Sequence, residues 1–188
     1  MAIVNVGALP KTSEGSSLVD KWMVKAHFIA GIAFFFLALL AGLAFSTQFM
    51  RNYLFPGIEI LSPGRVRMIH TNMAAYGFLA NLFFGGLYWA VPRLTGERVW
   101  KRGVSIFLFW AWQAILVATF VGQMFGFAQG VEWAETPIFI DPVVVIGVLL
   151  MTVNFYVPIL RTKEKPLYVS LWYFTAAFVW TGLVYIMG

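Results

Sequence analysis

The chain contains no cysteine, only two histidines and few charged residues. Without cysteine, it can form no disulfide, no thiolate nucleophile and no cysteine-ligated zinc or iron–sulfur site. Charged residues make up 11% of the 188 positions and hydrophobic residues 61%, whereas about a quarter of a soluble domain is charged. Too little polar surface remains to cover a water-soluble globule. The composition therefore indicates an integral membrane protein.

Five uncharged runs are long enough to cross a bilayer as helices, which takes about 20 residues. We expect helices because each span must satisfy its own backbone in lipid, and the alternation of a β-barrel strand is absent. The sequence thus predicts an all-α, polytopic membrane protein, with a cytoplasmic segment over residues 1–25 and a five-helix membrane domain over 26–188. The first 25 residues lack the apolar core of a cleaved signal peptide, so we expect the first span to be retained. The spans are Ala26–Met50, Met68–Pro92, Gly103–Val131, Pro142–Leu160 and Leu167–Gly188.

Basic residues are distributed unevenly between the two sides of the membrane. The N-terminal segment and the loops after the second and fourth spans share one side, and that side carries most of the Lys and Arg residues. The opposite side has only Arg51, Arg65 and Arg67. The positive-inside rule then predicts a cytoplasmic N-terminus and an outer C-terminus. Membrane orientation accounts for the net charge of +5, so no nucleic-acid partner is expected.

One histidine, His70, lies in the stretch SPGRVRMIHTN at the outer start of the second span. On a regular helix it shares a face with Arg67 and with a stripe of small or slightly polar residues, namely Met73, Ala74, Gly77 and Asn81. Such a face would let a flat haem approach closely, with His70 as axial ligand and Arg67 near the propionates. Small residues at this spacing are also typical of helix–helix packing. The pattern alone leaves both interpretations open.

The second histidine, His27, lies at the cytoplasmic end of the first span, two residues after Lys25. This position is typical of side chains that meet the lipid headgroups. We therefore expect His27 to be interfacial rather than a ligand.

Four motifs in matching order resemble the catalytic subunits of C-type (cbb-type) haem–copper oxidases and the related nitric oxide reductases. GRVRMIHTN resembles the start of their second transmembrane helix and FLFWAWQ (Phe107–Gln113) the third. VEWAETPIFID (Val131–Asp141) resembles the acidic stretch that follows, and PLYVSLWYF (Pro166–Phe174) the entry to the fifth helix. The resemblance implies that the chain is the N-terminal five-helix part of such a subunit.

The resemblance also implies roles for individual residues. His70 corresponds to the axial ligand of the low-spin haem b, and Arg67, and less closely Arg65, to arginines near haem propionates. Glu132 corresponds to a glutamate that ligates a calcium ion between propionates, and carboxylate oxygen suits this hard cation. Glu135 is expected either to support that site or to lie in an ordinary exposed acidic loop.

The family's catalytic subunit has many more than five spans. Two histidines cannot supply a low-spin haem, a high-spin haem and a copper site together, and the spans contain no charged residue for a proton relay. We therefore expect the chain alone to reduce neither oxygen nor nitric oxide, and instead to be part of a respiratory oxidoreductase.

The favoured hypothesis is a split catalytic subunit in a bacterial or archaeal cytoplasmic membrane. The remaining helices would lie on a separate membrane chain, and a c-type cytochrome subunit would supply electrons. Two alternatives stay open. One is a structural or assembly subunit without haem, and the other is a small homodimeric cytochrome b in which each copy contributes His70.

Overall fold

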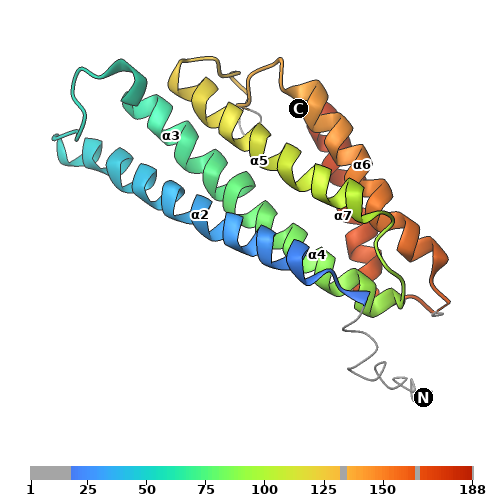
Figure 1. Ribbon diagram of the computed structural model, residues 1–188. Coiled ribbons are helices and arrows are strands. Elements are labelled where there is room, and N and C mark those ends of the chain that lie inside the picture. Colours follow the sequence, from blue (N-terminus) through green and yellow to red (C-terminus); the bar gives the residue numbers. More distant parts are fainter. Residues whose placement is uncertain (1–17, 132–134, 164–165, 188) are drawn as a thin grey trace, which may run out of the picture.

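The computed structural model describes residues 18–131, 135–163 and 166–187, and within these ranges it contains helices and no strand. Helix α2 runs alongside the continuous α3–η3–α4 rod, α5 lies beside that rod, and α6 and α7 complete the bundle (Figure 1). Among the described residues, five helical segments are long and apolar enough to span a membrane. The all-α, five-span prediction is therefore confirmed. The elements are α2 (Lys21–Ser46), η1 (Thr47–Met50), η2 (Glu59–Leu61), α3 (Pro63–Asn72), η3 (Met73–Leu79), α4 (Ala80–Thr95), α5 (Arg102–Met124), α6 (Asp141–Arg161) and α7 (Val169–Met187).

The helix ends are determined by local capping interactions rather than by the limits of the uncharged runs. Helix α2 begins at Lys21, because the Asp20 carboxylate accepts hydrogen bonds from the backbone of Trp22 and Met23 at 3.1 and 3.3 Å. Helix α3 begins at Pro63, because proline at a first helical position sacrifices no hydrogen bond. The helix that contains His70 therefore starts earlier than the uncharged run does.

The third span ends before the uncharged run does. Helix α5 stops at Met124, and Gly126 follows with a φ of +84°, a left-handed conformation that favours glycine. The turn is closed by the Phe127 amide, which donates to the Gly122 carbonyl at 2.8 Å. The described parts of the loop that follows, residues 125–131 and 135–140, lie at the end of the bundle where α3 begins (Figure 1).

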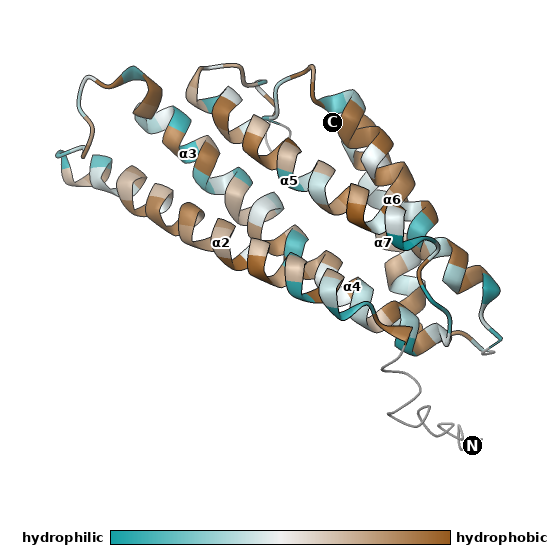
Figure 2. Cartoon of the chain, viewed as in Figure 1, coloured by the Kyte–Doolittle hydropathy of each residue, from teal (hydrophilic) through white to brown (hydrophobic). Residues whose placement is uncertain are grey.

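Hydrophobic residues predominate along the helices, and hydrophilic residues gather mainly at the two ends of the bundle (Figure 2). Many large hydrophobic side chains are exposed on the helices. This distribution is the one expected for helices in a bilayer, where the surrounding solvent is itself apolar. Inside, small residues allow close helix contact. A Cβ on Gly77 would lie 2.7 Å from Phe34, and one on Gly85 would lie 2.8 Å from Phe28. Helix α2 therefore packs tightly against the second span.

The second span is not a uniform α-helix. Residues Met73–Leu79 form a π-helical segment, η3, directly after the α3 turn that carries His70, and the Ala80 amide donates to the Ala75 carbonyl five residues back. A π turn holds one more residue than an α turn, and such segments are frequent at functional sites. Since each α-helical residue turns the chain by about 100°, the segment sets the angle between residues before and after it.

The small-residue stripe predicted on this span serves two purposes. His70 and Ala74 line a groove beside α2, whereas Gly77 packs against Phe34. Met73 leaves the stripe and is fully buried in a cluster with residues of α2 and α5. The packing interpretation therefore describes Gly77, whereas His70 and Ala74 border the groove.

Candidate functional site

His70 lies in the last turn of α3 and faces the backbone of α2. Its Nδ1 is 2.8 Å from the carbonyl oxygen of Ala38. A carbonyl only accepts, so Nδ1 carries the proton and donates. A Cβ on Gly42 would come within 2.6 Å of the imidazole ring. The absence of a side chain at Gly42 is thus what allows the ring to lie against the helix.

This hydrogen bond determines the chemistry available at the other ring nitrogen. With Nδ1 protonated, the neutral imidazole carries its lone pair on Nε2. Histidines that ligate metals commonly donate their second N–H to a backbone carbonyl in this way, which fixes the tautomer and orients the ring. His70 is therefore arranged as a metal-ligating histidine would be.

The ring also lines a groove between α2 and the second span. The groove has a volume of about 570 Å³, within the range of sites for cofactors and other small molecules. Its walls are apolar apart from the imidazole. A flat, largely apolar macrocycle with a metal at its centre fits this combination of groove and single donor. The lining residues are Phe35, Ala38, Leu39, Gly42, Leu43, His70, Ala74, Phe78 and Leu79.

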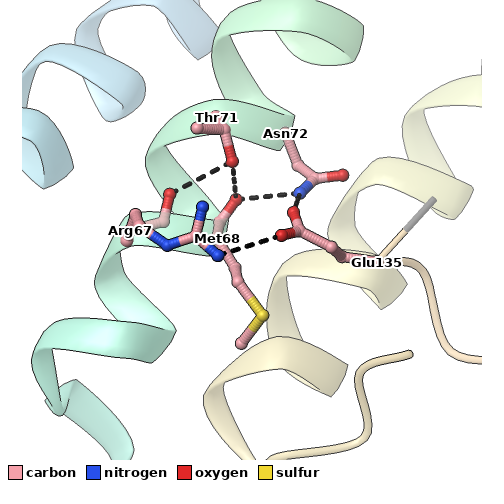
Figure 3. Close-up of polar contacts among 5 residues, drawn as sticks. All are labelled: Arg67, Met68, Thr71, Asn72 and Glu135. Carbon is pink, nitrogen blue, oxygen red and sulfur yellow. Dashed lines mark hydrogen bonds and ion pairs between the residues drawn. The ribbon is translucent and has the colours of Figure 1, made fainter. Parts of the chain in front are cut away.

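A second polar group surrounds the buried carboxylate of Glu135, from the loop between α5 and α6. Arg67 donates to its Oε1 at 3.3 Å, and the Asn72 amide donates to its Oε2 at 2.6 Å (Figure 3). Glu135 is 5% exposed, whereas the Arg67 side chain is 46% exposed. One side of Arg67 therefore compensates the buried charge, and the rest of its guanidinium remains accessible.

Arg65 has a different environment. It donates to the Glu59 carboxylate at 2.8 Å and to the Met124 carbonyl at 2.9 Å. The carbonyl belongs to the C-terminal end of α5, where a cation is favourable. A Cβ on Gly126 would lie 2.9 Å from the Arg65 guanidinium. Arg65 thus joins the start of the second span to the end of the third.

The acidic loop contains a further network that the sequence did not predict. The Asp141 carboxylate accepts from Thr136 at 2.7 Å, from Tyr185 at 2.8 Å and from Gln129 at 2.6 Å. These contacts tie the loop to α6 and α7. Among the described residues, no three His, Asp or Glu side chains gather closely enough to hold a metal ion. Glu132, the predicted calcium ligand, lies outside the described residues.

The predicted interfacial position of His27 is wrong. His27 has no exposed surface, and its Nδ1 donates to Asn81 Oδ1 at 2.9 Å. Its ring stacks on Tyr88, with centroids 5.5 Å apart, and meets Phe109 edge-on. Helix α2 begins at Lys21, nearly two turns before His27, so the histidine lies inside the bundle rather than at its rim.

Asn81 and Gln113 complete this second buried polar cluster. Gln113 Nε2 also donates to Asn81 Oδ1, at 2.9 Å, and Asn81 Nδ2 donates to the Gly77 carbonyl at 2.7 Å. From the sequence, Asn81 was placed only on the small-residue stripe of the second span. The sequence did carry a signal for this cluster, since α2, α4 and α5 each contain one of these polar side chains within an otherwise apolar run.

These features define a helical membrane protein in which a transmembrane histidine is oriented by a neighbouring helix beside an apolar groove. The model of the family "Cytochrome C and Quinol oxidase polypeptide I" matches residues 22–188. The chain belongs to this family, and it corresponds to the N-terminal part of a haem–copper oxidase subunit I.

Curated relatives agree with this assignment. Cytochrome c oxidase subunit 1 of Rhodobacter capsulatus is 28% identical over 159 residues, 84% of this chain and 30% of that protein. The Cbb3-type cytochrome c oxidase subunit CcoN1 of Stutzerimonas stutzeri is 26% identical over 66% of this chain and 26% of its own length. A nitric oxide reductase subunit of the same organism is 29% identical over 55% of this chain and 21% of its own length. The chain thus spans less than a third of the length of these relatives.

Proposed function

We propose that this chain supplies one axial ligand, His70, to a low-spin haem b in an oxidase- or nitric-oxide-reductase-like respiratory complex. The observation that carries the proposal is the hydrogen bond from His70 Nδ1 to the Ala38 carbonyl, which leaves Nε2 with its lone pair. A haem bound there supplies one-electron transfer at its iron. Ala38 and Gly42 hold the imidazole, and the apolar groove walls exclude water from it.

We propose that the second axial ligand is a histidine from outside these 188 residues. The sequence contains one other histidine, His27, and its Nδ1 is committed to Asn81 in a separate buried cluster. We therefore propose further helices packed over the His70 groove, on a separate membrane chain, with a c-type cytochrome subunit as electron donor. The bacterial relatives favour a bacterial or archaeal cytoplasmic membrane, and the uneven distribution of Lys and Arg favours a cytoplasmic N-terminus.

For the outer end, we propose that Arg67 interacts with haem propionates and that Glu132 ligates calcium, with support from Glu135. Arg67 keeps exposed guanidinium surface for an additional anion. The Glu135 carboxylate accepts one hydrogen bond from Arg67 and one from Asn72, and a carboxylate has about four lone-pair sites, so it retains capacity for a cation. Arg65 is the weaker candidate, because Glu59 and the Met124 carbonyl already engage it.

Mild-detergent purification of the complex tests this function. The expected result is copurification with a histidine-bearing membrane chain and a reduced-minus-oxidised spectrum of low-spin haem b. A chain that carries no haem in any assembly would support the structural-subunit alternative. A haem-loaded, six-coordinate complex that contains only copies of this chain would instead support the homodimeric cytochrome b.

A further inference from the structure

The buried cluster of His27, Asn81 and Gln113 is connected to the segment next to His70. Asn81 Oδ1 accepts from His27 and from Gln113, both at 2.9 Å, so its amide is held by α2 and α5 at once. With its oxygen fixed in this way, Asn81 directs Nδ2 back along its own helix, where it donates to the Gly77 carbonyl at 2.7 Å. Gly77 belongs to the π-helical segment η3 (Met73–Leu79).

The π-helical segment lies between two contacts that both involve α2. Before it, His70 bonds to Ala38, and after it, Asn81 bonds to His27. Replacing the π turn by an α turn would remove one residue from the turn and rotate one contact relative to the other by about 100°. Both contacts with α2 can then no longer be made together. The conformation of η3 is therefore coupled to the direction in which His70 points.

We propose that Asn81, fixed by His27 and Gln113, is a positioning residue for His70. It acts by satisfying the Gly77 carbonyl and keeping η3 in its π-helical form. None of the three cluster residues lines the groove that His70 borders. This inference rests on the proposed role of His70 as a haem ligand. It adds that the buried cluster sets the orientation of that ligand.

The experiment compares variants in the assembled complex. Asn81→Leu removes the hydrogen bonds to His27, Gln113 and Gly77 at similar volume. His27→Phe keeps an aromatic ring beside Tyr88 but removes one donor, and Gln113→Leu removes the other. The matched control is Asn154→Leu, because Asn154 is an equally buried amide that bonds to Tyr88 and Ser105 instead.

Two readouts are needed. Amide hydrogen–deuterium exchange of the peptide that covers 73–79 reports on η3 whether or not haem is bound. The electron paramagnetic resonance g-values and the midpoint potential of the low-spin haem report on the orientation of its ligand. Asn81→Leu is expected to accelerate exchange over 73–79 by about tenfold, the factor for one lost buried hydrogen bond, and to shift the haem signal. His27→Phe and Gln113→Leu should act in the same direction with smaller amplitude.

Asn154→Leu should leave both readouts at their wild-type values. The proposal is overturned if Asn81→Leu behaves like Asn154→Leu in either readout. If Asn81→Leu does not assemble, the two single-donor variants decide in the same way. If His70→Ala itself retains an unchanged low-spin haem, the proposed function fails, while the exchange measurement still decides whether the cluster holds η3.

Discussion

His70 donates from Nδ1 to the main-chain carbonyl of Ala38 on the neighbouring helix, 2.8 Å away. The contact joins the histidine that borders the groove to a backbone atom that no side-chain substitution can remove. The orientation of the ring thus depends on how closely α2 and α3 approach each other. Gly42, one turn beyond Ala38, permits that approach.

The first prediction concerns the ligand itself. His70→Ala in the assembled complex should abolish the low-spin haem b signal, because the imidazole is the one nitrogen donor among the side chains that line the groove. His27→Ala should retain the haem, since His27 lies in a different buried cluster. Reduced-minus-oxidised spectra and haem quantification of both variants provide the measurement. An unchanged spectrum in the His70 variant would contradict the assignment.

The second prediction uses a pair of glycines. Gly42→Ala places a Cβ 2.6 Å from the His70 ring, so either the ring or α2 must move. Overpacking of this kind typically costs about 1–3 kcal/mol, and we expect reduced haem occupancy together with a lower melting temperature. Gly86→Ala is the control, because nothing lies within 4 Å of a Cβ at that helical position. Gly86→Ala should keep full haem occupancy; equal losses in the two variants would argue against a specific role for Gly42.

The sequence was sufficient to predict the spans, because the hydrophobic runs and the helical requirement of the bilayer leave few alternatives. It was less informative about their ends. The third span stops at Met124 because Gly126 adopts a left-handed turn, and this event leaves no trace in hydropathy. The predicted interfacial position of His27 was wrong for a related reason. Asp20 caps α2 so that the helix begins at Lys21, which places His27 nearly two turns into the bundle.

The candidate site shows the same division between local and long-range information. His70 and Arg67 were candidates because they share a helical face, but only the family resemblance favoured a haem over helix packing; Glu135 was a candidate from its motif. The partners of these residues could not be selected. Asn72 bonds to Glu135 across 63 positions, and Arg65 bonds to Met124 across 59. The π-helical segment also depends on tertiary contacts, because nothing in MAAYGFL distinguishes it from an ordinary apolar helix.

The third prediction concerns calcium. Glu132→Ala should lower the calcium content of the purified complex and reduce haem retention, since the loss of a carboxylate ligand weakens a site built from oxygen atoms. Glu59→Ala is the control, because Glu59 is an exposed carboxylate that is paired with Arg65. Metal analysis after dialysis provides the measurement. A wild-type complex without stoichiometric calcium would remove the basis for the predicted site.

The last prediction separates Arg67 from Arg65 by the midpoint potential of the haem. Positive charge near a haem favours the reduced state, so Arg67→Ala should lower the potential. Arg65→Ala should have much less effect, because its charge is directed to Glu59 and the end of α5. A typical solvent-screened charge interaction of about 0.2–1 kcal/mol corresponds to roughly 10–40 mV.

A change at Glu135, the buried partner of Arg67, should shift the midpoint potential in the opposite direction. Glu135→Gln removes a negative charge from the same location and should therefore raise the potential, while the neutral side chain retains a hydrogen-bonding contact with Asn72. Opposite shifts for Arg67→Ala and Glu135→Gln, with Arg65→Ala near the wild-type value, are the pattern expected if these groups act on the haem by charge. Redox titration of the three variants checks it. Shifts of equal size and sign in both arginine variants would indicate instead that Arg67 and Arg65 act as interfacial anchors, and that the haem responds only to a general disturbance of this end of the bundle.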